Sequence, residues 1–361
     1  VINKVNEIDF NSSDDRHLFG DIYEKLLSEL QSAGDAGEFY TPRAVTEFIV
    51  DRVNPELHEK ILDPACGTGG FLVNVIEHLR KKATSEDDQK LLQEAFKGIE
   101  KKHLPYILCM TNLLLHGIDI PNNVKSDNTL ARPLISWGMN EKVDVIVTNP
   151  PFGVSWKSEK DFVKNEAKNT NGRFFVGTPR TSDGSLLFLQ HLIHKMNPEG
   201  SRIGIVLNGS PLFTGDAGSG ESEIRKWIIE NDWLECIVQL PDHMFFNTGI
   251  GTYFWIVTNK KSEERKGNVQ LIDGSSFYKD MKKSLGSKRK EISIEQSDQL
   301  FNIYKSFEEG EFSKIYSNNF FGYTKVVVEQ PLKDNGEVVT NKKGELKPDL
   351  TKRDHELSLI H

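Results

Sequence analysis

From about residue 60 onward, short apolar runs typical of buried strands alternate with segments whose apolar residues have helical spacing. Short apolar runs predict buried strands at residues 61–63, 96–100, 143–148, 202–207, 236–240 and 252–258, with one more short strand near residues 123–126. Apolar residues at helical spacing predict intervening helices at residues 71–80, 104–116, 186–196 and 221–230. This alternation predicts an α/β fold with a doubly wound, mostly parallel, seven-stranded sheet. Ligands of such sheets bind at the carboxyl ends of the strands.

The chain divides into three expected regions. Residues 1–50 form a helical N-terminal extension, because apolar positions between 14 and 31 have helical spacing and a proline at 42 opens a second helix. Residues 51–275 form the catalytic domain. Residues 276–361 form a charged C-terminal extension that we expect to be truncated, with a basic run near 279–290 and a hairpin or linker at 336–344.

Composition narrows the class of protein. Of the 361 residues, 37% are hydrophobic and 27% are charged, and no apolar run is long enough to span a bilayer, so we expect a soluble protein with no membrane partner. The cysteines Cys66, Cys109 and Cys236 form no C-x-x-C pair, which favours a cytoplasmic location and no metal site. The net charge of -8 indicates that much of any grip on nucleic acid belongs to another subunit.

A glycine-rich turn follows the first strand, at residues 63–71 (DPACGTGGF). It is neither G-x-G-x-x-G nor a P-loop, so it is not built for a pyrophosphate. Asp63 places a carboxylate at the turn, which suits an ammonium group. Glu100 ends the second strand and can accept hydrogen bonds from ribose hydroxyls, and Asp127 follows the third strand and can accept from an adenine amino group. S-adenosylmethionine has all three parts, and aromatic side chains at 39 and 40 suit its sulfonium.

The tetrapeptide Asn149-Pro150-Pro151-Phe152 comes directly after an apolar strand. It holds a side-chain amide, a backbone carbonyl and an aromatic ring at the lip of the sheet. These groups can grip a flat base or amide that carries an exocyclic NH2. A strand that merely ends in a Pro-Pro turn is the alternative for this motif taken alone.

The order of these motifs resembles that of amino-group DNA methyltransferases. FYTP at 39–42, the glycine turn at 63–71, the acids at 100 and 127, and NPPF at 149–152 follow one another. The wording GEFYTPR, LDPACGTGGFL and TNPPFG is similar to that of the modification (methylase) subunit of type I restriction–modification systems, and so are the segments at 202–213 and 240–261. The resemblance covers roughly residues 14–330.

The resemblance implies a Rossmann-like, S-adenosylmethionine-dependent methyltransferase fold. It implies a site-specific DNA adenine-N6 methyltransferase that acts on double-stranded DNA in a hetero-oligomer with specificity and restriction subunits. By position, the implied cofactor-binding residues are Phe39, Tyr40, Thr41, Pro42, Asp63, Ala65, Gly67, Thr68, Gly69, Gly70, Phe71, Glu100, Asp127 and Asn149. The implied catalytic residues are Asn149, Pro150, Pro151 and Phe152.

The expected chemistry is direct methyl transfer to a poor nucleophile, the N6 nitrogen of adenine. The Asn149 side-chain oxygen and the Pro150 carbonyl would accept the two N6 hydrogens, while the flipped base stacks on Phe152. Phe245 or Phe246 would pack on the far face of the base. No covalent intermediate is needed, so the cysteines are expected to be structural.

Residues 154–183 are polar and lack a clear period. One interpretation is a mobile, DNA-facing loop, and the other is a mixed-charge loop without a role. Its candidate DNA contacts are Lys157, Lys160, Lys164, Lys168, Arg173 and Arg180.

Three other functions stay open from the sequence. The first is a methyltransferase of another planar amino or amide target: cytosine N4, RNA adenine or protein glutamine. The second is a non-catalytic scaffold subunit, and the third is a self-sufficient restriction–modification enzyme lacking its nuclease part.

Overall fold

The computed structural model describes residues 41, 43–118, 123–131, 141–245, 249–285 and 288–359. Its helices are α3 (Arg43–Val53), α4 (Gly70–Arg80), α5 (Glu86–Glu94), α6 (His103–Leu115), α7 (Lys160–Ala167), α8 (Ser185–Lys195), α9 (Ser210–Phe213), α10 (Gly220–Glu230) and α11 (Ile294–Ser306). The helix expected between residues 14 and 31 lies outside the described residues, as do Phe39, Tyr40, Pro42 and Phe246.

The central sheet has nine strands in the order β11-β8-β6-β7-β5-β4-β1-β2-β3. They are β1 (Ile61–Asp63), β2 (Phe96–Glu100), β3 (Val124–Ser126), β4 (Val145–Thr148), β5 (Arg202–Asn208), β6 (Leu234–Gln239), β7 (Thr252–Thr258), β8 (Asn268–Asp273) and β11 (Ser313–Ser317). Strands β1 to β5 are parallel to one another, and β7 runs antiparallel between β5 and β6. All seven expected strands are present. The expected number of strands was too low, because β8 and β11 extend the edge beyond β6.

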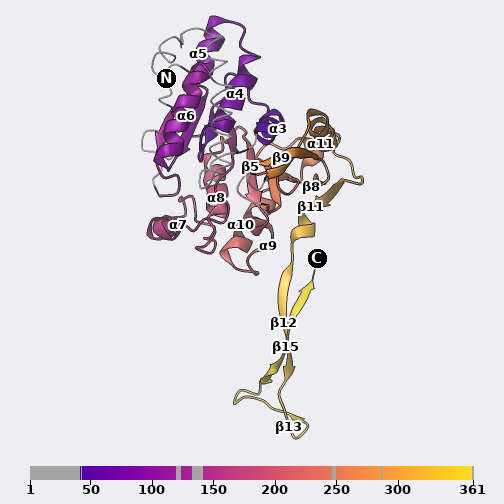
Figure 1. Cartoon of the computed structure of the whole chain (residues 1–361). Coiled ribbons are helices and arrows are strands. Elements are labelled where there is room, and N and C mark those ends of the chain that lie inside the picture. Colours follow the sequence, from indigo (N-terminus) through magenta and orange to yellow (C-terminus); the bar gives the residue numbers. More distant parts are fainter. Residues whose placement is uncertain are drawn as a thin grey trace.

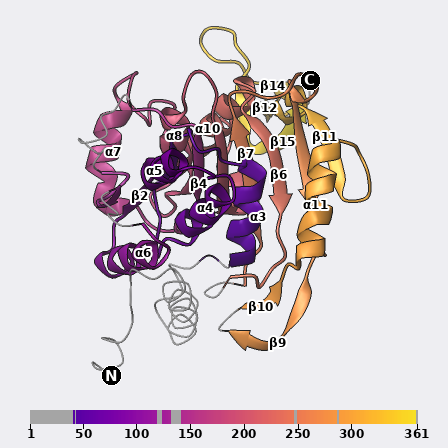
Figure 2. The same ribbon diagram turned by 90° about the horizontal axis from the view of Figure 1, so that it is seen from above.

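Helices cover both faces of this sheet, as a doubly wound fold requires (Figure 2). Successive strand residues point to opposite faces, so Ile61 and Val145 join one hydrophobic cluster while Leu62 and Ile146 join the other. The first cluster includes residues of α3, α4 and α6, and the second includes residues of α8 and α10. Two separate cores hold the strand ends in fixed positions relative to each other.

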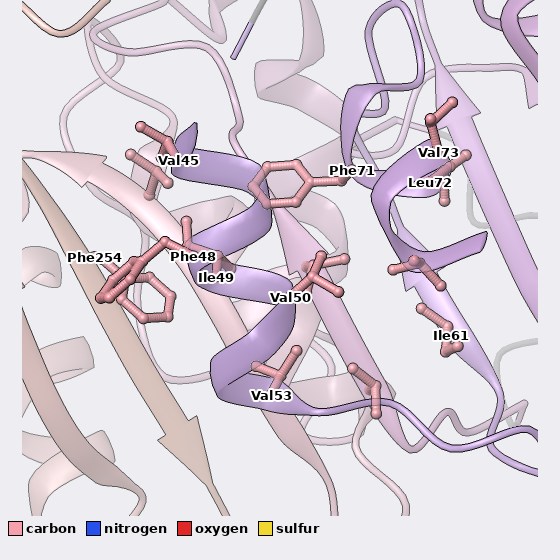
Figure 3. Close-up of a cluster of buried hydrophobic side chains, with 14 of the residues drawn as sticks. Val45, Phe48, Ile49, Val50, Val53, Ile61, Phe71, Leu72, Val73 and Phe254 are labelled. Atoms are coloured by element: carbon pink, nitrogen blue, oxygen red, sulfur yellow. The ribbon is translucent and has the colours of Figure 1, made fainter. Parts of the chain in front are cut away.

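Helix α3 packs across the sheet next to the start of α4. Phe48 and Ile49 point toward Phe254 on β7, and Phe71 of α4 lies on the other side of α3 (Figure 3). The rings of Phe48 and Phe254 meet edge to face with centroids 5.8 Å apart. The buried amide of Asn74 donates to the hydroxyl of Thr46, which joins the two helices. This packing places Thr41, just before α3, beside the glycine turn.

Residues 154–183 have more regular structure than their composition predicts. A short 3-10 turn (Lys157–Glu159) leads into α7, and Trp156, Val163 and Phe174 are fully buried in a small cluster with Leu130 and Leu187. The apolar residues of this segment are too few and too irregularly spaced for the cluster to be predicted from the sequence. Its mobility and its contact with DNA remain predictions.

The last described residues form an arm that leaves the body of the molecule (Figure 1). In it β12 (Thr324–Pro331) pairs antiparallel with β15 (Pro348–Leu359). Between them β13 (Lys333–Asp334) and β14 (Glu337–Val338) form a short hairpin that overlaps only the start of the hairpin or linker expected at residues 336–344. A second hairpin, β9 (Lys279–Leu285) and β10 (Lys288–Glu291), carries the basic run. No helix in the described ranges is both long enough and apolar enough to cross a bilayer.

Candidate active site

The glycine turn joins β1 to α4 at the carboxyl edge of the sheet. Gly67 and Gly69 have φ of 54° and 88°, a region that other residues adopt only with strain. A Cβ on Gly69 would lie 2.9 Å from the Cys109 sulfur, so the turn rests directly on α6. The amide of Asn112 on α6 also donates to the Thr68 carbonyl at 3.1 Å. The turn is therefore held from below and leaves its upper side to a ligand.

Asp63 lies at the base of this turn and is 1% exposed. Its Oδ1 accepts hydrogen bonds from the Thr148 hydroxyl at 2.7 Å and the Ala65 amide at 3.1 Å. Its Oδ2 is buried and has no partner among the described residues. Burial raises the pKa of Asp63 to about 7, against the lowering effect of those two bonds. A buried carboxylate with one unused oxygen is suited to a cationic ligand group.

Glu100 and Asp127 lie side by side at the ends of β2 and β3. The Asp127 amide donates to the Glu100 carbonyl at 3.1 Å. The Glu100 carboxylate accepts from the Gly67 amide at 3.0 Å and the Lys102 amide at 2.7 Å, and burial raises its pKa. Each carboxylate oxygen keeps a further lone pair for a hydroxyl or amino donor. The structure thus brings the three predicted acids to one edge, linked through the glycine turn.

Asn149 follows β4 and faces Thr41. Its Nδ2 donates to the Thr41 hydroxyl at 2.9 Å, and its Oδ1 is buried without a partner among the described residues. The contact joins the predicted FYTP element to the predicted NPPF element across 108 residues of sequence. It also fixes the amide so that the oxygen is the atom left for a substrate.

The rest of the tetrapeptide continues from Asn149 beyond the end of β4. Pro150 is buried, Pro151 is exposed and Phe152 is half-buried. Phe152 meets the ring of Phe245 edge to face at 5.9 Å between centroids. Phe245 itself is 2% exposed, so in this structure it supports Phe152 from behind.

Some predicted residues have side chains that point elsewhere. The Phe71 ring lies in the core beside α3, so only its backbone is near the turn (Figure 3). Arg173, predicted as a DNA contact, is 1% exposed and is bound by protein groups on every side. Its guanidinium cannot reach DNA, whereas Lys157 and Lys164 are exposed.

The cysteines have the structural role that we expected. All three are buried and free, and the sulfurs of Cys66 and Cys109 are 3.9 Å apart beneath the glycine turn. The contact with Cys109 and burial raise the pKa of Cys66, and burial raises that of Cys236. Protonated, buried thiols are poor nucleophiles.

The sequence analysis missed Thr148, Asn128 and Glu159, which organise the site, and it gave Arg173 a different role. Thr148 was detectable, because it is the one polar residue in the otherwise apolar β4 and sits beside Asn149. The other three act through contacts across distant parts of the chain, which leave no local pattern.

Two lysines of the basic run are paired with acids. Lys279 pairs with Glu295 at 3.6 Å, and Lys290 pairs with Asp242 and lies over the Tyr278 ring. Arg289 is exposed. Its backbone amide donates to the His243 carbonyl at 2.9 Å, which ties the hairpin to the loop that carries Phe245.

Comparison with known proteins places the chain among DNA methylases. The family model described as N-6 DNA Methylase matches residues 14–346. The type I restriction enzyme EcoEI methylase subunit of Escherichia coli is 50% identical over 255 residues, which is 70% of this chain. The MjaIX methylase subunit of Methanocaldococcus jannaschii is 29% identical over 94% of this chain. The chain spans about half the length of these relatives, 48% and 58% respectively.

Solved structures agree. The modification subunit of a putative type I restriction enzyme from Vibrio vulnificus superimposes with a TM-score of 0.71 and 29% identity, over 96% of this chain and 66% of that one. A chain from a solved type I restriction–modification system has the same TM-score, with 30% identity over 88% of this chain and 63% of that one. Because the family model covers most of the sequence and both the fold and the ordered motifs match, the chain belongs to the N-6 DNA methylase family.

Proposed function

We propose that this chain transfers a methyl group from S-adenosylmethionine to the N6 nitrogen of adenine in double-stranded DNA. We propose that it does so as the modification subunit of a type I restriction–modification complex. One observation carries the proposal: two buried side-chain oxygens, Asp63 Oδ2 and Asn149 Oδ1, have no hydrogen-bond partner among the described residues. Buried polar atoms are rarely left unpaired unless a ligand completes them.

The residues present fit the proposed cofactor. Asp63 would hold its ammonium group, the backbone of the turn from Ala65 to Gly70 its amino acid part, Glu100 its ribose and Asp127 its adenine. Thr41 would lie at its methionine end, since the Thr41 carbonyl is 3.9 Å from a Cβ built on Gly70. When bound, S-adenosylmethionine supplies an electrophilic methyl group on a sulfonium.

The tetrapeptide would activate the base. Asn149 Oδ1 and the Pro150 carbonyl would accept the two N6 hydrogens, which draws electron density onto the nitrogen and turns its lone pair out of the ring plane. Within the described residues the Pro150 carbonyl accepts no backbone hydrogen bond. Both acceptors are fixed before the base arrives, so their dipoles stabilise the positive charge that develops on nitrogen without reorganisation.

Phe152 would receive the flipped base. A base inside a duplex is out of reach, and flipping it costs a few kcal/mol, which stacking on an aromatic ring offsets. The edge-to-face contact with Phe245 holds the Phe152 ring in one orientation.

Relatives support the remaining parts of the proposal. The chain is similar to methylase subunits of type I restriction enzymes. We therefore propose double-stranded DNA and the specificity and restriction subunits as its partners. The net charge of -8 is consistent with a DNA grip shared with those subunits. The three free cysteines favour a cytoplasmic location. The family description favours DNA adenine over cytosine, RNA or protein targets.

The variant Asn149→Ala tests the catalytic role. It should bind sinefungin, a non-reactive cofactor analogue, as wild type does, while methyl transfer falls roughly 10²–10³-fold, the usual effect of losing one preorganised polar group. Calorimetry measures binding, and mass spectrometry of nucleosides from DNA treated with the assembled complex measures N6-methyladenine.

Two results would contradict the proposal. Methylation at near wild-type rate by Asn149→Ala would remove the proposed role of the amide. N4-methylcytosine in place of N6-methyladenine in wild-type reactions would move the activity to the rival base.

A further inference from the structure

The segment that follows the tetrapeptide reaches behind both adenosine-binding acids. Glu159 is 6% exposed, and its Oε1 accepts from Lys101 Nζ at 2.7 Å and from Asn128 Nδ2 at 2.9 Å. Lys101 is the residue directly after Glu100, and Asn128 is the residue directly after Asp127. One carboxylate therefore joins the two strand ends that carry the predicted ribose and adenine ligands.

Asn128 passes this contact on to the turn after β3. Its backbone amide donates to Asp127 Oδ1 at 2.7 Å, and its own Oδ1 accepts from the Leu130 amide at 3.1 Å. An Asn128 side chain held by Glu159 thus fixes both the Asp127 carboxylate and the turn behind it. The Asp127 amide bond to the Glu100 carbonyl closes the network.

Arg173 binds the same turn from the other end of the segment. Its guanidinium donates to the Thr129 carbonyl at 2.7 Å and the Leu130 carbonyl at 3.1 Å. The Glu166 carboxylate of α7 accepts from Arg173 Nε at 2.8 Å and Nη2 at 2.7 Å, so the buried charge is paired within the segment. Arg173 Nη1 also lies 3.0 Å from Nδ1 of His191 on α8. Such a bidentate, desolvated pair is rigid.

The segment is closed at its base. The Gly184 amide donates to the Val154 carbonyl at 3.0 Å, and the indole of Trp156 donates to the Arg180 carbonyl at 2.9 Å. The first and last residues of the segment therefore move together, only two residues beyond Phe152.

We propose that residues 154–183 form a brace for the adenosine end of the cofactor pocket and that Glu159 is its positioning residue. The brace connects the base-binding tetrapeptide to the strand ends that carry Glu100 and Asp127. It rests on the proposed function, because it assigns these two acids to an adenosine-bearing ligand. The exposed lysines of the segment are left to face DNA.

The charge of Glu159 suits this role. Burial alone would raise the pKa of Glu159, but hydrogen bonds from Lys101, Ser158 and Asn128 outweigh it and lower the pKa. The side chain is therefore an anion that accepts from both neighbours at neutral pH. Ligand carboxylates must be held to within about 0.5 Å to act together, which a supporting group behind them provides.

The test is sinefungin binding to the full chain, measured by calorimetry. Glu159→Ala should weaken binding about tenfold, the scale of one hydrogen bond to a charged group. Glu159→Gln keeps an acceptor of the same size and should lose less. Asp161→Ala removes an exposed acid two residues away and should bind as wild type does. Lys101→Ala removes one partner of Glu159 and alters only a side chain that is 59% exposed. It therefore still tests the brace if Glu159→Ala does not fold.

Amide exchange separates positioning from general stability. In Glu159→Ala without ligand, amides of residues 127–131 should exchange faster while those of β4 and β5 do not change. Wild-type affinity for sinefungin in Glu159→Ala, or in both Glu159→Gln and Lys101→Ala, would overturn the brace. If wild type itself binds no sinefungin, the proposed function fails, and the exchange at 127–131 still decides whether Glu159 holds that turn.

Discussion

At the scale of single residues, Asp63 shows how burial and hydrogen bonding compete in this pocket. Loss of water around the carboxylate raises its pKa to about 7, while bonds from Thr148 and Ala65 lower it and Glu100 nearby raises it further. A carboxyl with a higher pKa in the folded than in the unfolded chain binds its proton more tightly when folded. Asp63 therefore stabilises the ligand-free fold at low pH, and this contribution is lost as the pH rises from about 4 to about 7.

The variant Asp63→Asn isolates that effect. It cannot ionise, so its free energy of unfolding relative to wild type should improve as the pH rises from about 4 to about 7 and should level off above that. Urea unfolding of both proteins at several pH values gives the difference between their free energies of unfolding. The contributions of the other titrating groups, which the two proteins share, cancel in this difference. An unchanged difference across this range would show that Asp63 has an ordinary pKa.

The same residue should control the pH dependence of cofactor binding. An ammonium ligand needs the ionised carboxylate, so the wild-type affinity for sinefungin should fall about tenfold per pH unit below about 7. Asp63→Asn should bind weakly with no such slope. Calorimetry in buffers of different ionisation enthalpy should also detect proton release by wild type near pH 6, and its absence would contradict the assignment.

The position of the candidate site residues at the sheet edge could be predicted, because each of them belongs to a local motif. Asp63, Glu100 and Asn149 each end a strand that is visible in the hydrophobic pattern. The contacts of Glu159 and Arg173 with the ends of β2 and β3 could not be predicted, since Lys101, Asn128 and Thr129 lie 31 to 58 residues away in sequence. In the sequence they look like any charged residues of a polar loop.

At the scale of elements, the glycine turn depends on the helix beneath it. Gly69 combines a φ of 88° with a Cβ position that meets the Cys109 sulfur at 2.9 Å. Both features exclude a side chain, the first through backbone strain and the second through overlap.

Gly69→Ala should destabilise the chain by roughly 2–4 kcal/mol, the sum of left-handed strain and overpacking. Gly218→Ala is the matched control, because Gly218 has a φ of 79° but no atom within 4 Å of its Cβ position. That variant should lose only about 1 kcal/mol. Urea unfolding measures both losses.

The double variant Gly69→Ala, Cys109→Ala identifies the overlap. If the Cys109 sulfur is the obstacle, the two substitutions should cost less together than the sum of the single losses. Additive losses, or equal losses for Gly69→Ala and Gly218→Ala, would show that α6 does not restrict the turn.

Elements with strong periodicity were predicted well. The strands and helices that were predicted between β1 and β7 lie within a few residues of their expected bounds, because they bury apolar faces or stripes in the two cores. Helix α5 was missed, since it buries only Leu92. Its capping box, Ser85 with Asp88, was the available signal. Strand β11 is the edge strand and is mostly polar, and in β8, its inner neighbour, Gln270 interrupts the apolar residues, so neither strand shows a clear pattern.

At the scale of the whole molecule, the arm of β12 and β15 stands apart from the catalytic body. The strands pair with each other and point away from the sheet (Figure 1). Among the described residues, those assigned to cofactor or base binding lie within residues 41–152, and the brace lies within residues 154–183. The arm is therefore not needed to form the site.

Removal of residues 324–361 should leave the body intact. Its unfolding temperature should stay within about 2 °C of the original, because fewer than 0.5 kcal/mol is expected from a change outside the core. The affinity for sinefungin should also be unchanged. A two-stranded ribbon without a packed face is marginal in water, so amides of β12 and β15 should exchange fast in the intact chain while those of β4 and β5 stay protected. A large drop in unfolding temperature on truncation, or slow exchange in the arm of the isolated chain, would mean that the arm packs on the body.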